Sequence, residues 1–174
     1  MTDQTPVETT NLDRYGAPPM QWSRARDLLE SSTPKPEVPF FLGTCRPDGR
    51  PHSAGIGALW LDGDLYLTSG PGTRKSRNLA VNPACTISAR LPGMDLVLEG
   101  EATRCTDAQT LARAASGYRD GGWPAEVDGD ALTAPYSAPS AGPPPWHLYR
   151  FRFRTAFGLN TEEPHGATRW RFDR

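Results

Sequence analysis

Lysine is the scarcest charged residue of this 174-residue chain. The sequence has 19 lysines and arginines against 20 acidic residues, and only Lys35 and Lys75 are lysines. The formal net charge is therefore −1. A protein that binds nucleic acid through the phosphate backbone needs a basic face, so this charge balance argues against nucleic acid as the main partner.

Cysteine is also scarce. Cys45, Cys85 and Cys105 are odd in number and widely spaced, and the chain has no CxxC pattern or Cys/His cluster. This excludes a disulfide framework and a zinc site, so we expect no metal and regard the three cysteines as small core residues.

Long hydrophobic runs are absent. No apolar stretch approaches the roughly 18–20 residues that cross a bilayer, so we expect no contact with a membrane. Residues 1–21 are polar and have no apolar region of the signal-peptide kind. We therefore expect a cytoplasmic protein.

Proline and glycine are abundant, with 18 and 17 copies, and they concentrate near the N-terminus and in residues 121–145. We interpret residues 1–21 as a flexible arm and residues 22–174 as one domain. Residues 121–145 have no periodicity, and two interpretations stay open. They form a disordered surface loop, or they form a lid over a site.

The pattern of the domain predicts a mostly β fold. Short strands with alternating or apolar patterns are separated by turn residues, such as Asp62-Gly63, and few helices intervene. This arrangement favours a closed or nearly closed antiparallel barrel. The expected strands are 39–45, 51–61, 64–69, 84–91, 95–106, 147–154 and 168–173, and the expected helices are 24–30 with Ser23 as N-cap, 74–81, and about 107–119.

The segment 69–79 has the composition of a phosphate-binding loop. Gly70 and Gly72 permit a tight turn, and the helix that begins at Arg74 offers free N–H groups and a positive dipole end. Arg74 and Lys75 add cationic donors. A solvated basic helix start is the alternative. A Walker A loop is disfavoured because Arg74 stands where that motif requires glycine.

The strand before this loop has one nearly bare face. Ser53, Gly55 and Gly57 share a side of the strand, and a flat ring can lie against such a row. The alternative is that the glycines only bend the strand. The opposite row, which begins at His52, is interpreted as core, and the role of His52 stays open between an acid–base group and a packed side chain.

Four motifs in this order resemble the pyridoxamine 5′-phosphate oxidase-like superfamily, and most closely its flavin/deazaflavin-dependent oxidoreductase branch. They are Phe-Leu-Gly-Thr at 41–44, Arg-Pro-Asp-Gly-Arg-Pro-His at 46–52, Leu-Asp-Gly-Asp-Leu-Tyr-Leu-Thr at 61–68, and Gly-Thr-Arg-Lys-Ser-Arg-Asn-Leu at 72–79. The resemblance implies an antiparallel split β-barrel, called the FMN-binding split barrel, that forms a homodimer with a flavin-type cofactor at the interface. By this resemblance Arg74 and Lys75 hold the cofactor phosphate, with Ser69, Thr73 and Asn78 nearby.

The resemblance implies an oxidoreductase that transfers a hydride between this cofactor and a small organic substrate. The cofactor is FMN or the deazaflavin coenzyme F-420. We favour F-420 slightly because of the Arg-Asn-Leu ending of the helix start, with Arg46, Arg50 and Arg77 as further cations for its anionic tail. Residues 168–173 lack the histidine of the family's Arg-Leu-His-Asp motif, which argues against pyridoxamine phosphate as substrate. We expect the second subunit to wall the pocket with Trp123, Tyr136 or Trp146. The alternative function is a non-catalytic flavin- or haem-binding protein on the same barrel.

Overall fold

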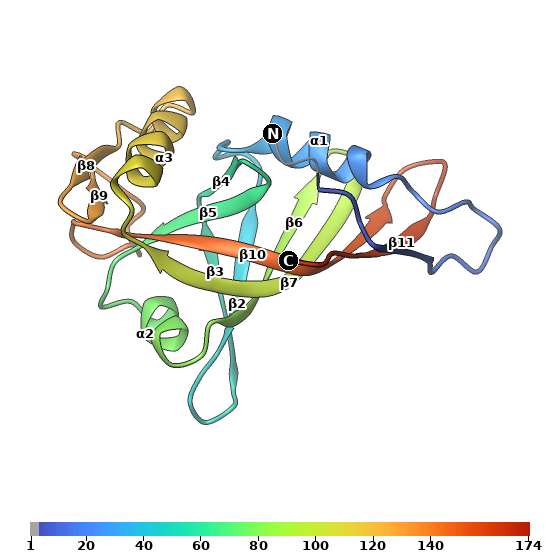
Figure 1. The fold of residues 1–174 in the computed structure, drawn as a ribbon, viewed down its shortest axis with the longest axis horizontal. Coiled ribbons are helices and arrows are strands. Elements are labelled where there is room, and N and C mark those ends of the chain that lie inside the picture. The colour runs from blue at the N-terminus through green and yellow to red at the C-terminus, as the bar shows by residue number, and fades with distance from the viewer. Residues whose placement is uncertain (1–3) are drawn as a thin grey trace.

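A computed structural model describes residues 4–174 of the chain, and Figure 1 shows the arrangement of its helices and strands. The helices are α1 (Trp22–Ser32), α2 (Arg74–Val81) and α3 (Ala108–Asp120). The strands are β1 (Glu8–Asn11), β2 (Phe40–Cys45), β3 (Pro51–Ile56), β4 (Ala58–Leu61), β5 (Asp64–Ser69), β6 (Ala84–Leu91), β7 (Met94–Cys105), β8 (Glu126–Asp128), β9 (Ala131–Thr133), β10 (His147–Asn160) and β11 (Ala167–Arg171).

The predicted antiparallel split barrel is confirmed. Strand β10 is the centre, because it pairs with β7 along one edge and with β5 and then β11 along the other. From β7 the sheet continues through β6 and β2 to β3. The chain then passes through Gly57 into β4, which pairs with β5 and so returns to β10. The barrel is thus closed through the backbone at Gly57 rather than by a β3–β4 ladder.

The core consists of the inward side of these strands, with α1 at one end. Trp170, Phe151 and Phe153 are fully buried. Trp22 of α1 packs edge-on against Trp170, with ring centroids 5.5 Å apart. Large aromatic surfaces removed from water dominate the stability of such a core. A second, smaller cluster lies under α3, where Leu111 and Ala114 pack with Leu59 and Leu148.

The structure corrects the sequence prediction at several places. The segment 51–61 forms two strands with different partners, because the pairing changes from β2 to β5 on either side of Gly57. Helix α1 begins at Trp22 with Gln21 as N-cap and no side-chain cap, so Ser23 does not cap it. Residues 121–145, for which no strand was predicted, contain the β8–β9 hairpin.

Strand β1 was also not predicted, since its sequence Glu-Thr-Thr-Asn lies in the segment expected to be a flexible arm. It forms the edge of the sheet beside β11, where Glu8 accepts hydrogen bonds from Arg169 and Arg171. Residues 1–3 of that expected arm lie outside the described residues. Within residues 4–174, no helix has the length and apolarity needed to cross a membrane.

Residues 134–145 follow a defined path beside the loop that precedes α2. Three hydrogen bonds hold this segment at both ends. The amide of Gly70 donates to the carbonyl of Ala141 (3.2 Å), and the indole N–H groups of Trp123 and Trp146 donate to the carbonyls of Tyr136 (2.7 Å) and Gly142 (3.0 Å). The segment therefore lies beside the predicted phosphate loop, to which the amide of Gly70 joins it.

Candidate functional site

The loop before α2 is shaped by its own hydroxyl groups. Thr73 is the N-cap of α2, and its Oγ1 accepts a hydrogen bond from the amide of Ser76. The Oγ atoms of Ser69 and Ser76 lie 2.8 Å apart, and Ser69 Oγ lies 2.8 Å from Thr73 Oγ1. Because these hydroxyls bond to one another, they fix the loop, and the charges that it offers to a ligand come from the first residues of α2.

Lys75 is the most unusual of these residues. It is only 7% exposed, and it makes no hydrogen bond or ion pair with any residue from 4 to 174. Burial lowers the pKa of its ammonium group, since loss of water disfavours the charged form. Most of the side chain is buried, and its ammonium group has no counter-charge among residues 4–174, so the position is suited to a bound anion.

The surroundings of Lys75 are cationic as well. Arg74 is a second cation in the same cavity of about 710 Å³, which His52 also lines and whose lining contains no aspartate or glutamate. The pKa of His52 is lowered first by burial and then by the charges of Arg46, Arg74 and Lys75. We call this cavity the cationic cavity. Arg46 lies outside its lining, and the Nε of Arg46 is buried without a hydrogen-bond partner among residues 4–174.

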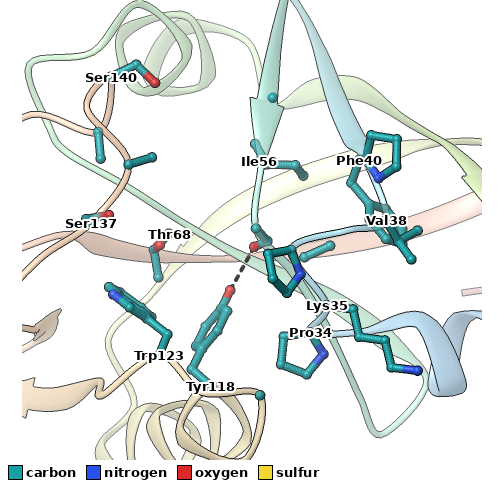
Figure 2. A pocket seen from close by; sticks show the side chains of 18 of the residues that line it. Pro34, Lys35, Val38, Phe40, Ile56, Thr68, Tyr118, Trp123, Ser137 and Ser140 are labelled. Carbon is teal, nitrogen blue, oxygen red and sulfur yellow. Dashed lines mark hydrogen bonds between the residues drawn. The ribbon is translucent and has the colours of Figure 1, made fainter.

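A second cavity of about 660 Å³ lies on the other side of Lys75, and Figure 2 shows its side chains. Its walls are mostly apolar, so we call it the apolar cavity. Lys75, Ser140 and Ala141 line both cavities, and Lys75 therefore lies at their junction. The side chains drawn around the apolar cavity include Pro34, Val38, Phe40, Ile56, Tyr118 and Trp123.

Gly55 and Gly57 form an open floor at one side of the apolar cavity. A Cβ atom at either position would meet no atom within 4 Å, and neither backbone has a positive φ. Neither packing nor backbone conformation within this chain therefore requires glycine there. Space without a side chain is what a flat group lying on the strand needs.

The structure brings five of the eight predicted cofactor residues to the cavities. Gly55 and Gly57 line the apolar cavity, Thr73 and Arg74 line the cationic cavity, and Lys75 lines both.

Three predicted residues line neither cavity. Ser53 lies on the exposed face of the edge strand β3, and Ser69 is buried within the hydroxyl cluster. Asn78 is 1% exposed, and its amide donates to the hydroxyl of Thr44 (2.9 Å), which joins α2 to β2. In the row interpreted as core, His52 and Ala54 are half-buried and line the cationic cavity.

Sequence reasoning missed Tyr118. Its hydroxyl donates to the carbonyl of Gly57 (3.0 Å), so α3 supports the open floor (Figure 2). Burial raises the pKa of this hydroxyl and keeps it protonated. In the sequence Tyr118 continues the apolar stripe of Leu111, Ala114 and Ala115, so only its role as core was visible.

Trp123 and Tyr136 were expected to come from a second subunit. Here they line the apolar cavity of the same chain. Within residues 4–174, no group of three or more His, Cys, Asp or Glu side chains is arranged to hold a metal ion.

Comparisons with known proteins bear on the family and on the fold. The sequence pattern of the family described as pyridoxamine 5′-phosphate oxidase matches residues 26–157, which is more than half of the chain. Among the curated proteins no sequence matches the chain.

Several solved structures share the fold. An F-420 reductase is 23% identical, with a TM-score of 0.54 over 75% of this chain and 94% of that chain. A pyridoxamine 5′-phosphate oxidase-related, FMN-binding protein from Nostoc punctiforme is 18% identical, with a TM-score of 0.54 over 87% and 90%. A haem-binding protein from Mycobacterium smegmatis is 17% identical, with a TM-score of 0.60 over 87% and 59%.

Proposed function

Since this chain belongs to the pyridoxamine 5′-phosphate oxidase family, we propose that it is an oxidoreductase with a flavin-type cofactor, coenzyme F-420 or FMN. The cofactor transfers a hydride to or from a small organic substrate. The observation that carries this proposal is the position of Lys75, a mostly buried cation that has no partner among residues 4–174 and lies between an apolar and a cationic cavity. A ligand with a flat ring at one end and a phosphate at the other matches both cavities.

The residues at the site have separate tasks in this proposal. Arg74 and Lys75 bind the phosphate, together with free amides of the helix start. Gly55 and Gly57 leave room for the ring, which supplies the redox chemistry when it is bound. Ser69, Thr73 and Asn78 act indirectly, since their hydrogen bonds fix the loop and helix that present the cations.

The cationic cavity favours F-420 over FMN. Its volume of about 710 Å³ exceeds what one phosphate needs, and its lining carries cations without acidic residues. Arg46, one of the three further cations that the sequence indicated, lines neither cavity, but its charge lowers the pKa of His52, which lines the cationic cavity. Arg50 is neutralised by Asp48, to which it donates two hydrogen bonds of 2.9 and 2.6 Å.

The C-terminal strand supports a substrate other than pyridoxamine phosphate. Residues 167–171 form β11 between β10 and β1, and Trp170 is fully buried in the core. Arg169 and Arg171, the cations of this strand, both form ion pairs with Glu8. Both arginines of this strand therefore already have an acidic partner within the chain.

A homodimer is part of the proposal. The register of the sheet places Gly55, Phe41, Ser88, Val97 and Phe157 in one row across β3, β2, β6, β7 and β10. Phe41 is 47% exposed and Val97 is 38% exposed, although both are apolar. Phe41 also lines the apolar cavity. A second copy on this row buries the exposed side chains and closes the cavity beside Gly55.

The test is a titration of the purified protein with FMN and with F-420, followed by absorbance and fluorescence. We expect saturable binding with tighter affinity for F-420. Gly57→Val places a side chain on the open floor and is expected to abolish binding with little loss of stability, because a Cβ atom at this position meets no neighbour within 4 Å. Thr103→Val, on an exposed position of β7, is the matched control.

Turnover decides between the two functions. Reduction or oxidation of the bound ring by members of a substrate panel supports the oxidoreductase. Binding without any turnover supports the non-catalytic alternative. If neither cofactor binds, the proposal is wrong.

A further inference from the structure

The apolar cavity extends beyond the glycine floor, toward the linker after α1 and the end of α3. We propose that this end is a substrate chamber, and that it accepts a flat, mainly apolar molecule that carries no positive charge. The inference rests on the proposed function, because the chamber adjoins the floor assigned to the ring. It goes further in naming the class of substrate and the residues that select it.

One wall of the chamber consists of two aromatic rings. Trp123 meets Tyr118 edge-on, with centroids 5.2 Å apart and an interplanar angle of 90°. Their polar atoms are already used, since Tyr118 Oη donates to Gly57 and Trp123 Nε1 donates to Tyr136. The rings therefore offer carbon surfaces to a ligand, and flat molecules pack well on such surfaces.

The opposite wall is the linker between α1 and β2. Pro34 and Val38 contribute its apolar side chains, and Phe40, the first residue of β2, continues this wall, as Figure 2 shows. Trp60 N donates to Thr33 Oγ1 (2.9 Å), which anchors the linker to β4.

The two walls meet at the end of α3. A Cβ atom on Gly121 would lie only 2.4 Å from the Cγ of Pro34, so the linker and the helix end are in direct contact. This contact bounds the chamber on one side and limits the length of a substrate.

The charges of the lining exclude cations. Aspartate and glutamate are absent from the lining of the apolar cavity, which contains both lysines of the chain. Lys35 is exposed at the rim, and Lys75 is buried at the junction with the cationic cavity. A positively charged ligand would therefore lose water, meet two like charges and find no counter-charge. Hydroxyl groups of the lining can donate to one or two acceptors on the ligand; they belong to Thr68, Tyr136, Ser137 and Ser140.

Acridone and N-methylacridinium test the proposal, since they are planar tricycles of similar size and differ in charge. Binding of each is measured by fluorescence anisotropy on the full chain, with and without the cofactor that saturates it. We expect the cofactor-loaded protein to bind acridone at least about tenfold more tightly than the cation. Cofactor affinity is expected to stay unchanged when acridone is present.

Val38→Trp narrows the chamber from the linker side. We expect it to weaken acridone binding by about tenfold or more, because the larger ring occupies the ligand's volume. The affinity for cofactor should stay within about twofold, since Val38 lies on the wall away from the phosphate loop. Val127→Trp, at a 43% exposed position of β8, is the control for an added tryptophan. Ser137→Phe narrows the chamber from the other side and replaces Val38→Trp if that variant does not fold.

Three results would overturn the inference. They are equal affinity for the two probes, displacement of the cofactor by acridone, and acridone binding that neither narrowing variant weakens. The two proposals also fail separately. If no cofactor binds but acridone binds and Val38→Trp blocks it, the chamber stands and the proposed function falls. If cofactor binds and acridone does not, the proposed function stands and the chamber falls.

Discussion

Two buried charges of opposite sign lie at different places on the barrel, and they differ in whether the chain supplies a charged partner. Asp64 on β5 is 1% exposed and is surrounded by arginines. Lys75 on α2 is 7% exposed and has no partner among residues 4–174. A buried charge that the chain itself neutralises belongs to the architecture. A buried charge left without a partner indicates a ligand.

The Asp64 cluster joins the C-terminus to the barrel. Arg150 Nε donates to Asp64 Oδ2 at 2.6 Å, and Arg174 donates to Asp64 Oδ1. The guanidinium of Arg174 also lies 4.8 Å from the ring centre of Phe153, a fully buried residue. The carboxylate thus holds the last residue of the chain against the core.

Asp64→Asn removes the negative charge of the Asp64 cluster. Of the variants proposed, it should lower the free energy of unfolding most. The amide keeps the size of the side chain and leaves the partly buried arginines without a counter-charge. Loss of one partner of a buried pair costs about 3–5 kcal/mol of unfolding free energy. Urea unfolding followed by circular dichroism measures the loss.

Asp95→Asn is the matched control for Asp64→Asn. Asp95 also pairs with an arginine through two hydrogen bonds of 2.7 and 2.9 Å, but Arg90 is exposed. Exposed pairs contribute little, so the control should lose far less stability. Equal losses in the two variants would show that burial does not distinguish the clusters.

Lys75→Met removes the buried charge that has no partner among residues 4–174. The stability of the apo protein should rise, and the affinity for the cofactor should fall. The apo protein should gain up to about 1 kcal/mol of unfolding free energy, since an unpaired buried charge is replaced by an apolar chain of similar length. Affinity for F-420 or FMN should fall by about 10- to 100-fold, the worth of one charged hydrogen bond. Thermal unfolding without ligand and cofactor titration measure the two effects.

Lys35→Met is the control for the loss of one lysine, because Lys35 is exposed and lies on the linker. It should leave the stability of the apo protein and the affinity for the cofactor unchanged. A less stable apo protein after Lys75→Met would mean that the ammonium group already has a favourable interaction within the chain. That result would remove the contrast with Asp64.

Local signals were enough to predict the part of the site that is contiguous in sequence. Helix α2 begins and ends where predicted, because Thr73 caps it and Asn82-Pro83 ends it. The turn at Asp62-Gly63 was equally clear, and both residues have the positive φ that such a hairpin requires. The prediction of a cationic helix start therefore needed no tertiary information.

The rest of the site depends on contacts between distant segments. The break at Gly57 was missed because the apolar pattern of 51–61 continues through it, and only the change of partner strand divides it. The path of residues 134–145 was left open because proline and glycine give no periodic pattern. It is set by the indole groups of Trp123 and Trp146 and by the amide of Gly70.

Tyr118→Phe tests the connection between α3 and the floor, and it has the smallest expected effect on ligand binding. The change removes one hydroxyl, which leaves the carbonyl of Gly57 without this donor and removes a second, longer bond of 3.4 Å to the carbonyl of Tyr66. We expect a loss of about 1–2 kcal/mol of unfolding free energy, as for other buried hydrogen bonds. Tyr149→Phe, a buried position on β10 outside both cavities, is the control for stability.

The binding measurements show whether the floor and the phosphate loop are separate. Since the hydroxyl positions Gly57, Tyr118→Phe should weaken acridone binding by a few-fold. Binding of inorganic phosphate near Lys75 should not change, because that site depends on charges of α2. Burial raises the pKa of the Tyr118 hydroxyl, so it stays a donor through neutral and mildly basic pH, and the few-fold effect should be constant there. An equal loss of phosphate affinity would mean that the two cavities are coupled. They would then differ in the polarity of their linings but not in their response to a change in α3.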